Sequence, residues 1–112
     1  MNIVKDAHRV VVKVGSSTLT HETGKLNLRH MERLTQALSD FKNAGKEIIL
    51  VTSGAVSAGR SKLGVDHRPA SIEEKQAMAA VGQTELMRTY DRFFSRYGHT
   101  VAQILITRNS IE

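Results

Sequence analysis

The sequence predicts an α/β fold in which helices pack on a layered, parallel sheet. Three short runs of aliphatic residues alternate with segments of helical periodicity, in the order β-α-β-α-α-β. The apolar run at residues 48–51 is continuous rather than alternating, which is typical of a strand covered on both faces. The segments between the strands are long enough for the crossovers that parallel pairing requires.

The first strand is expected at residues 9–14, which read Arg-Val-Val-Val-Lys-Val. Three successive valines favour an extended backbone, because β-branched side chains pack well on a pleated surface. We expect the strand to end at Gly15. The hydroxyl-rich segment 16–25 that follows is expected to be a polar loop with a turn at Gly24.

An amphipathic helix is predicted after this loop. Apolar side chains recur there at three- and four-residue steps and form one face, as expected for a helix that packs on a core. Asn27 is placed to cap the first turn, and Gly45 is placed to end the helix in the left-handed conformation. The residues of the apolar face are Leu28, Met31, Leu34, Leu38 and Phe41.

A second strand is predicted at residues 46–52 and a helix at residues 54–63. Between them lie Ser53, Gly54 and Ala55, none of which has a side chain larger than a hydroxymethyl group. Small residues at this point either let two elements pack closely or let a ligand reach the backbone. The residues themselves leave both explanations open.

The rest of the chain contains one long helical region and a third strand. Ser71 begins a capping box, Ser-Ile-Glu-Glu, and the helical region that it opens extends to about Tyr97. The small residues Ala-Ala-Val-Gly that end at Gly82 indicate a close packing surface between helices, and Gly82 is also expected to kink or break the helix. The third strand is expected at residues 100–107.

Length and composition are those of one compact globular domain. The chain has 112 residues, of which 40% are hydrophobic and 24% charged. Its apolar runs are too short to cross a bilayer, and residues 1–6 lack the apolar segment of a secretory signal. The absence of cysteine excludes disulfides and thiolate chemistry. These features predict a cytoplasmic protein that does not associate with membranes.

Charge and aromatic content narrow the choice of binding partner. The net charge of +5 is compatible with nucleic acid or with phosphorylated small molecules. Aromatic residues make up only 4% of the chain, and Tyr90, Phe93, Phe94 and Tyr97 follow helical spacing, which argues against a base-stacking surface. Nucleic acid is therefore not the expected partner. The five histidines lack the spacing of metal ligands, so no residue is assigned to a metal.

The candidate site lies where the predicted strands end, because ligands of open parallel sheets bind beyond the carboxyl ends of the strands. Glycines, hydroxyls and a nearby cation gather at these ends. Such residues suit an anion, since glycine lets backbone N–H groups approach a phosphate and a helix N-terminus adds its positive dipole. The candidates are Lys13, Gly15 and Ser16 at the first end, Ser53, Gly54 and Ala55 at the second, and Thr107, Arg108 and Asn109 at the third.

Structural roles for the same residues compete with these functional ones. Lys13 precedes its glycine, so no G-x-x-x-x-G-K-[ST] pattern is present, and no G-x-G-x-x-G follows the first strand. A dinucleotide site is therefore not expected. Lys13 can also be a lysine whose stem lies along the strand and whose head reaches solvent. The Ser53-Gly54 pair can be a tight turn that lets a strand and a helix pack closely.

Four segments of the sequence match one family in order: VVVKVGSSTLT, VTSGAVSAGRSKLG, KQAMAAVGQTELM and QILITR. With them the chain, from about His8 to Arg108, resembles the amino acid kinase family, and within it the glutamate 5-kinase group. The resemblance implies a three-layer αβα sandwich with a mostly parallel sheet. Residues 1–112 would form its N-terminal, glutamate-side part, and the ATP-binding half would be absent from this sequence.

The resemblance also implies a reaction, the ATP-dependent phosphorylation of the L-glutamate γ-carboxylate that begins proline biosynthesis. ATP and Mg²⁺ would be the cofactors. The matching positions in this sequence are Lys13 for catalysis and phosphate contact, Gly15 and Ser16 for the phosphate side, and Ser53, Gly54 and Ala55 for the substrate.

A full-length protein of this kind is expected to be a homo-oligomer, and the chain alone is expected not to turn over. Two alternatives stay open. One is a member of the same family that acts on another carboxylate or phosphate acceptor. The other is a basic α/β module that binds a partner without catalysis.

Overall fold

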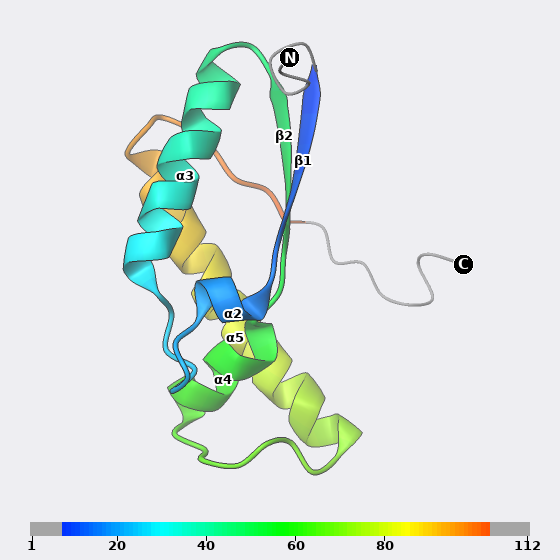
Figure 1. Ribbon diagram of the computed structural model, residues 1–112. Coiled ribbons are helices and arrows are strands. Elements are labelled where there is room, and N and C mark those ends of the chain that lie inside the picture. Colours follow the sequence, from blue (N-terminus) through cyan, green and yellow to red (C-terminus); the bar gives the residue numbers. More distant parts are fainter. Residues whose placement is uncertain (1–7, 104–112) are drawn as a thin grey trace, which may run out of the picture.

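The computed structural model of the chain describes residues 8–103. Within this range two strands and four helices follow the predicted order, apart from one short additional helix after the first strand (Figure 1). The elements are β1 (Arg9–Val14), α2 (Ser16–Leu19), α3 (Leu28–Asn43), β2 (Glu47–Thr52), α4 (Ala55–Leu63) and α5 (Ile72–Ser95).

β1 and β2 form a parallel pair, which confirms the predicted α/β arrangement. Their register aligns Val10 with Ile48 and Val14 with Thr52. Because the strands end together, the turns that follow them emerge at the same end of the sheet (Figure 1). Of the expected third strand, residues 104–107 lie outside the described range, and the preceding residues from position 100 belong to no helix or strand.

One face of the sheet carries the hydrophobic core. α3 and α5 both lie on this face (Figure 1), where Val12, Val14 and Leu50 point toward them. Burial of each large apolar side chain contributes about 1.5–3 kcal/mol to folding. The buried cluster consists of Val14, Leu19, Met31, Leu86, Tyr90 and Phe93.

The opposite face of the sheet is not covered by a helix within residues 8–103. Val11, Ile49 and Val51 are 61%, 45% and 46% exposed, although the continuous apolar run predicted cover on both faces. That expectation is wrong for the described part of the chain, because α3 and α5 pack on the same side. The described residues therefore form two layers of the expected sandwich, the sheet and one layer of helices.

The helix ends follow the capping residues that the sequence indicates. The Asn27 side chain accepts a hydrogen bond from the His30 backbone N–H at 3.2 Å, and Gly45, just after α3, has φ +91°. Ser71 Oγ accepts a hydrogen bond from the Glu74 N–H at 3.1 Å. The two side-chain caps satisfy N–H groups that a helix end leaves without an intrahelical partner.

Two local expectations are wrong. Residues 16–19 form the short helix α2 instead of a loop, because Leu19 is fully buried in the core and Thr20 Oγ1 donates to the Ser16 carbonyl at 2.8 Å. α5 continues through Gly82 without a break over its 24 residues. A helical glycine costs about 1 kcal/mol relative to alanine, but close contact with α4 offsets this cost. None of the described helices has the length and apolar composition needed to cross a membrane.

Candidate functional site

The turns after β1 and β2 are joined by hydrogen bonds. Ser53, the first residue after β2, donates from its backbone N–H to the Val14 carbonyl oxygen at 3.2 Å and from its Oγ to the same oxygen at 3.1 Å. The first bond extends the parallel ladder by one step, and the second fixes the serine side chain. The two turns are thereby held as one unit at the carboxyl end of the sheet.

Gly54 gives the second turn its shape. Its φ of +100° lies in the left-handed region that residues with a Cβ rarely adopt. A Cβ placed on Gly54 would lie 3.5 Å from the Cα of Ser16, an ordinary van der Waals distance, so the two turns lie close together. The structure therefore brings the candidate residues of the first and second turns side by side.

The N-terminus of α4 begins directly at the second turn. Gly54 caps the helix without a side-chain hydrogen bond, and the first bond within the helix runs from the Ala58 N–H to the Gly54 carbonyl at 2.9 Å. The N–H groups of residues 55–57 consequently have no helical acceptor. Together with the positive end of the helix dipole, they can hold a carboxylate or a phosphate.

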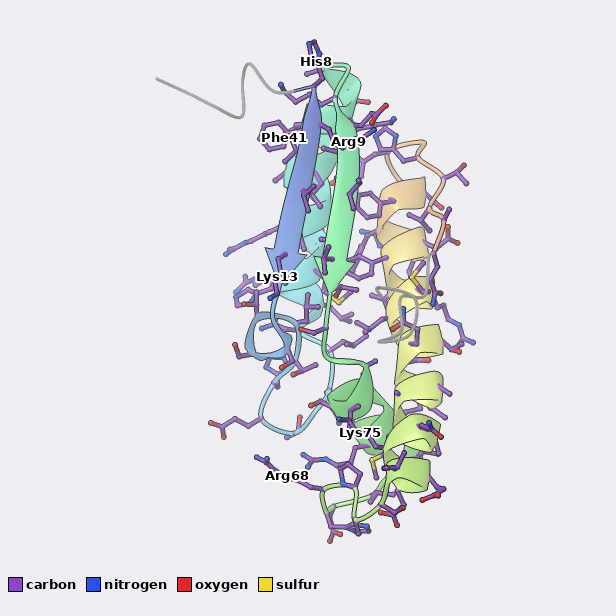
Figure 2. The ribbon with its side chains drawn as sticks, turned by 90° about the vertical axis from the view of Figure 1, so that its right-hand side faces the viewer. His8, Arg9, Lys13, Phe41, Arg68 and Lys75 are labelled. Carbon is purple, nitrogen blue, oxygen red and sulfur yellow. The ribbon has the colours of Figure 1, made fainter. Side chains whose placement is uncertain are left out.

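The first turn offers the Lys13 ammonium group and a backbone with free space around Gly15. Lys13 lies at the carboxyl end of β1 (Figure 2), its side chain is exposed, and it takes part in none of the ion pairs formed within residues 8–103. Gly15 has φ −79°, and a Cβ there would meet no atom within 4 Å. Ser16 is also exposed. This arrangement leaves room for an anionic group near the Lys13 ammonium.

A buried tyrosine supports the second turn from the core. The Tyr90 hydroxyl lies 3.1 Å from Thr52 Oγ1, and Tyr90 is 3% exposed. Burial raises the pKa of the Tyr90 hydroxyl above its ordinary value of 10.0, and the hydrogen bond with Thr52 opposes this rise. The neutral hydroxyl ties the end of β2 to α5. Sequence reasoning placed Tyr90 only on an apolar helical face, because no spacing signal links residues 38 positions apart.

The described residues suit phosphate and carboxylate groups rather than a metal ion. Mg²⁺ takes oxygen ligands, commonly one or two carboxylates besides phosphate oxygens. Within residues 8–103 no three histidine, aspartate or glutamate side chains gather closely enough to hold a metal. The two turns supply N–H groups, hydroxyls and the Lys13 ammonium. The candidates of the third strand end, Thr107, Arg108 and Asn109, lie outside the described range.

Comparison with known proteins gives these features a family context. Residues 8–112 match the amino acid kinase family. A glutamate 5-kinase of Clostridium perfringens is 52% identical over 109 residues, which cover 97% of this chain and 40% of the relative. For a glutamate 5-kinase of Moorella thermoacetica the identity is 58% over 105 residues, covering 94% of this chain and 28% of the relative. One from Listeria monocytogenes is 52% identical over 106 residues, covering 95% of this chain and 38% of the relative. The chain thus spans well under half the length of these relatives.

Proposed function

Because the chain belongs to the amino acid kinase family, we propose that it is the glutamate-side part of a glutamate 5-kinase. In this reaction the γ-phosphoryl group of ATP passes to the γ-carboxylate of L-glutamate and yields glutamyl 5-phosphate, the first step of proline biosynthesis. Relatives that carry this name and are 52–58% identical over most of the chain support the proposal. The ATP-binding half is expected in the part of the relatives that this chain does not span.

The observation that carries the proposal is the joint geometry of the two turns. The reaction brings a carboxylate and a polyphosphate together, and it needs positioning and charge neutralisation more than covalent chemistry. The first turn supplies the Lys13 ammonium group and free space around the backbone of Gly15. The second turn supplies the N–H groups at the start of α4. Because Ser53 bonds to Val14, the two turns keep a fixed spacing.

The roles of individual groups follow from their donors and lone pairs. Ser53 Oγ donates its proton to the Val14 carbonyl, so its lone pairs stay free to accept a hydrogen bond from an α-ammonium group. The N–H groups at the start of α4 suit the α-carboxylate. Lys13 would stabilise the charge that develops on the transferred phosphoryl group. The remaining candidates are assigned by position, Gly15 and Ser16 to the phosphate side and Gly54 and Ala55 to the glutamate side.

ATP and Mg²⁺ complete the proposed chemistry. ATP as the donor follows from the kinase chemistry of the named relatives, and Mg²⁺ accompanies nucleotide phosphates in such reactions. No side-chain cluster within residues 8–103 fits the metal, so we assign its ligands to the phosphates and to residues beyond this range. A homo-oligomer in the cytoplasm, acting on free L-glutamate, is part of the same proposal.

The test uses a chimera in which residues 1–112 replace the matching segment of the Clostridium perfringens relative. Release of ADP from Mg-ATP should depend on L-glutamate. Lys13→Ala should lower this rate about 100-fold or more, because it removes charge stabilisation from the transition state. Lys75→Ala is the matched control, since Lys75 lies on α5 far from Lys13 (Figure 2).

Two results would count against the proposal. A folded chimera that releases no ADP in response to L-glutamate would overturn the assigned reaction. Activity that survives Lys13→Ala unchanged would remove Lys13 from the mechanism.

A substrate comparison separates glutamate from another acceptor. In the proposed site, the α-ammonium group of L-glutamate donates a hydrogen bond to Ser53 Oγ. N-acetyl-L-glutamate lacks this ammonium group. Its kcat/KM should therefore be at least about 100-fold below that of L-glutamate, because a polar group of the site is left unpaired. A preference for the acetylated compound, or for L-aspartate, would place the chain with a different acceptor in the same family.

A further inference from the structure

The crossing of α4 and α5 lies directly behind the second turn. The two helices meet at Gly59 of α4 and Gly82 of α5, both of which are buried. A Cβ on Gly82 would overlap the carbonyl oxygen of Ala55, and would lie 2.6 Å from both the Ala55 carbonyl carbon and the Gly59 nitrogen. The backbones of α4 and α5 therefore touch without an intervening side chain, which requires glycine.

The two glycines contact different parts of the molecule. A Cβ on Gly59 would overlap the carbonyl oxygen of Met78, in the first half of α5. Gly82 instead abuts Ala55, the first residue of α4 and the last of the small residues that follow β2. Gly59 lies about one helical turn further along α4. Of these two glycines, Gly82 is the one that contacts the glutamate-side turn itself.

The turn is held at two points. At its start, the Val14 carbonyl accepts two hydrogen bonds from Ser53, at 3.1 and 3.2 Å. At its end, the backbone at Gly82 lies against Ala55. A side chain at position 82 would push on a carbonyl group that cannot rotate away, and the displacement would reach the serine within two residues.

We propose that Gly82 is a positioning residue for the glutamate site. The absence of a side chain lets α5 fix the place of the α4 N-terminus, so that the free N–H groups of residues 55–57 meet the substrate in a set direction. The identity of the ligand rests on the proposed function, whereas the contact between Gly82 and Ala55 does not. Gly82 acts through the turn and does not touch the substrate.

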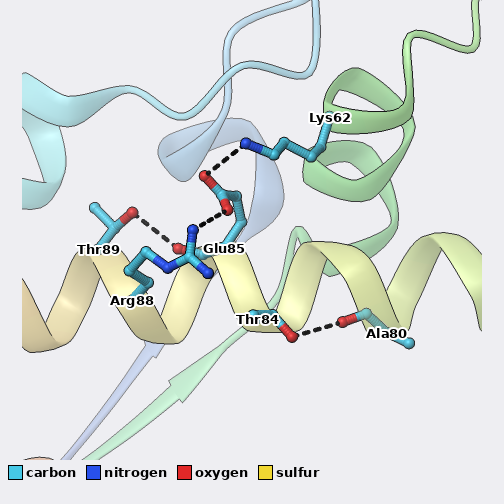
Figure 3. A network of polar contacts seen from close by, with 6 residues as sticks. All are labelled: Lys62, Ala80, Thr84, Glu85, Arg88 and Thr89. Atoms are coloured by element: carbon cyan, nitrogen blue, oxygen red, sulfur yellow. Dashed lines mark hydrogen bonds and ion pairs between the residues drawn. The ribbon is translucent and has the colours of Figure 1, made fainter.

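The same two helices are also linked at their surface, which provides a control. Lys62 Nζ of α4 lies 3.8 Å from Glu85 Oε1 of α5, and Arg88 Nη1 lies 3.5 Å from Glu85 Oε2 (Figure 3). The Lys62 and Arg88 side chains are mostly exposed and Glu85 is half-buried, and ion pairs this close to the surface contribute little to stability. Glu85→Gln therefore weakens the surface link between the helices without displacing Ala55. Leu86→Ala, which leaves a cavity in the core, is a second control that destabilises α5 without a clash.

Kinetics of the chimera give the first test. Gly82→Ala should lower kcat/KM for L-glutamate about 10- to 100-fold, mainly through KM, because a small misplacement of positioning groups is costly. The KM for ATP should change by less than about twofold, since Lys13 and Gly15 are not displaced. Glu85→Gln and Leu86→Ala should leave the KM for L-glutamate within about twofold of the parent. The proposal is overturned if Gly82→Ala raises both KM values together, or leaves the KM for L-glutamate at the level of Leu86→Ala.

Spectra of residues 1–112 test the geometry independently of the reaction. In proton–nitrogen correlation spectra, the amide signals of Ser53, Gly54 and Ala55 should shift in Gly82→Ala and stay in place in Glu85→Gln. If these amide signals shift but the parent chimera releases no ADP in response to L-glutamate, the proposed function fails. The role of Gly82 in positioning the turn then stands. If the parent chimera is active and the signals do not move, the positioning role fails alone.

Hydrogen exchange on the parent chimera keeps the proposal testable if Gly82→Ala does not fold. Binding at the turn should restrain the helix that supports it, so saturating L-glutamate should slow exchange in the peptide that contains Gly82. The peptide that contains Phe93, further along α5, should be unaffected. Slowed exchange at Phe93 but not at Gly82 would overturn the proposal.

Discussion

The turns after β1 and β2 occupy equivalent places at one end of the sheet, yet the fold holds them in different ways. Gly15, after β1, has φ −79° and open space around it. Gly54, after β2, has φ +100°, lies close to Ser16 and follows a serine that is bonded to the first strand. A methyl group added at Gly15 would meet no neighbouring atom, whereas Gly54 lies beside the first turn and directly before α4.

A glycine at the end of a strand can therefore have different structural roles. At Gly15 the missing side chain leaves free space, where we propose that the phosphate lies. At Gly54 it permits a left-handed backbone that turns the chain from β2 into α4. The first role concerns access and the second concerns conformation, so the two sites should respond differently to an added methyl group.

The largest effect on folding among these turn residues is expected for Gly54→Ala. A Cβ in the left-handed region costs about 1–2 kcal/mol, so the midpoint of urea unfolding should fall. Gly64→Ala is the matched control, because Gly64 ends α4 with φ +72° and open space around it. Both variants should lose similar stability, but only Gly54→Ala should raise the KM of the chimera for L-glutamate. Equal KM values in the two variants would exclude the second turn as the glutamate site.

Tyr90→Phe should weaken the support that the second turn receives from the core. Loss of the hydrogen bond with Thr52 is expected to cost about 1 kcal/mol. The pKa of Tyr90 is higher in the folded chain than the ordinary 10.0, so the folded state binds this proton more tightly than the unfolded state. The resulting stability is complete below pH 10.0 and is lost as the pH rises through the folded pKa.

Urea unfolding of both proteins across this alkaline range measures the effect. The stability of the parent chain relative to Tyr90→Phe should shrink as the pH increases. A constant difference between the two proteins would contradict the link between burial and protonation.

Ser53→Ala is expected to have a smaller effect on stability, about 0.5–1 kcal/mol. The variant loses the side-chain bond to Val14 but keeps the backbone bond at 3.2 Å, so the turn should stay in place. Ser16→Ala in the first turn is the control and should change stability by less than about 0.5 kcal/mol, because its hydroxyl is exposed. A larger loss of stability in Ser16→Ala than in Ser53→Ala would contradict the view that the second turn is the more tightly held of the two.

Gly15→Ala is expected to have the smallest effect on folding, with the opposite sign. Alanine fits a φ of −79° and restricts the unfolded chain, so stability should rise by about 0.5 kcal/mol. The added methyl group would occupy the space proposed for the phosphate, so the glutamate-dependent rate of the chimera should fall. A loss of stability on thermal unfolding would show that Gly15 has a conformational role after all.

Most of the secondary structure was predictable because its causes are local. The valine-rich segment before Gly15, the apolar face of α3 and the caps Asn27 and Ser71 each depend on residues within a few positions of one another. The meeting of the first two turns was also predictable, since parallel strands place their carboxyl ends together. The cover of the sheet was not, because an apolar run indicates burial without saying which segment provides it.

Gly82 shows why the remaining features escaped prediction. Helix propensity argues against a glycine inside a helix, and the expected break followed from that rule. The helix continues because α4 packs against it there, a contact between segments far apart in the sequence. The link between Tyr90 and Thr52 was missed for the same reason.

By itself the sequence determined where the first two strands and most helices lie, and that small residues follow β2. The choice between packing and ligand contact depends on what surrounds those residues, and only the tertiary structure shows these surroundings. Ala55 packs against Gly82 on one side, while the N–H groups at the start of α4 keep no helical acceptor. The size of a side chain is a property of the residue and can be read from the sequence. Which atoms lie next to Ala55 depends instead on how α5 packs against the turn after β2.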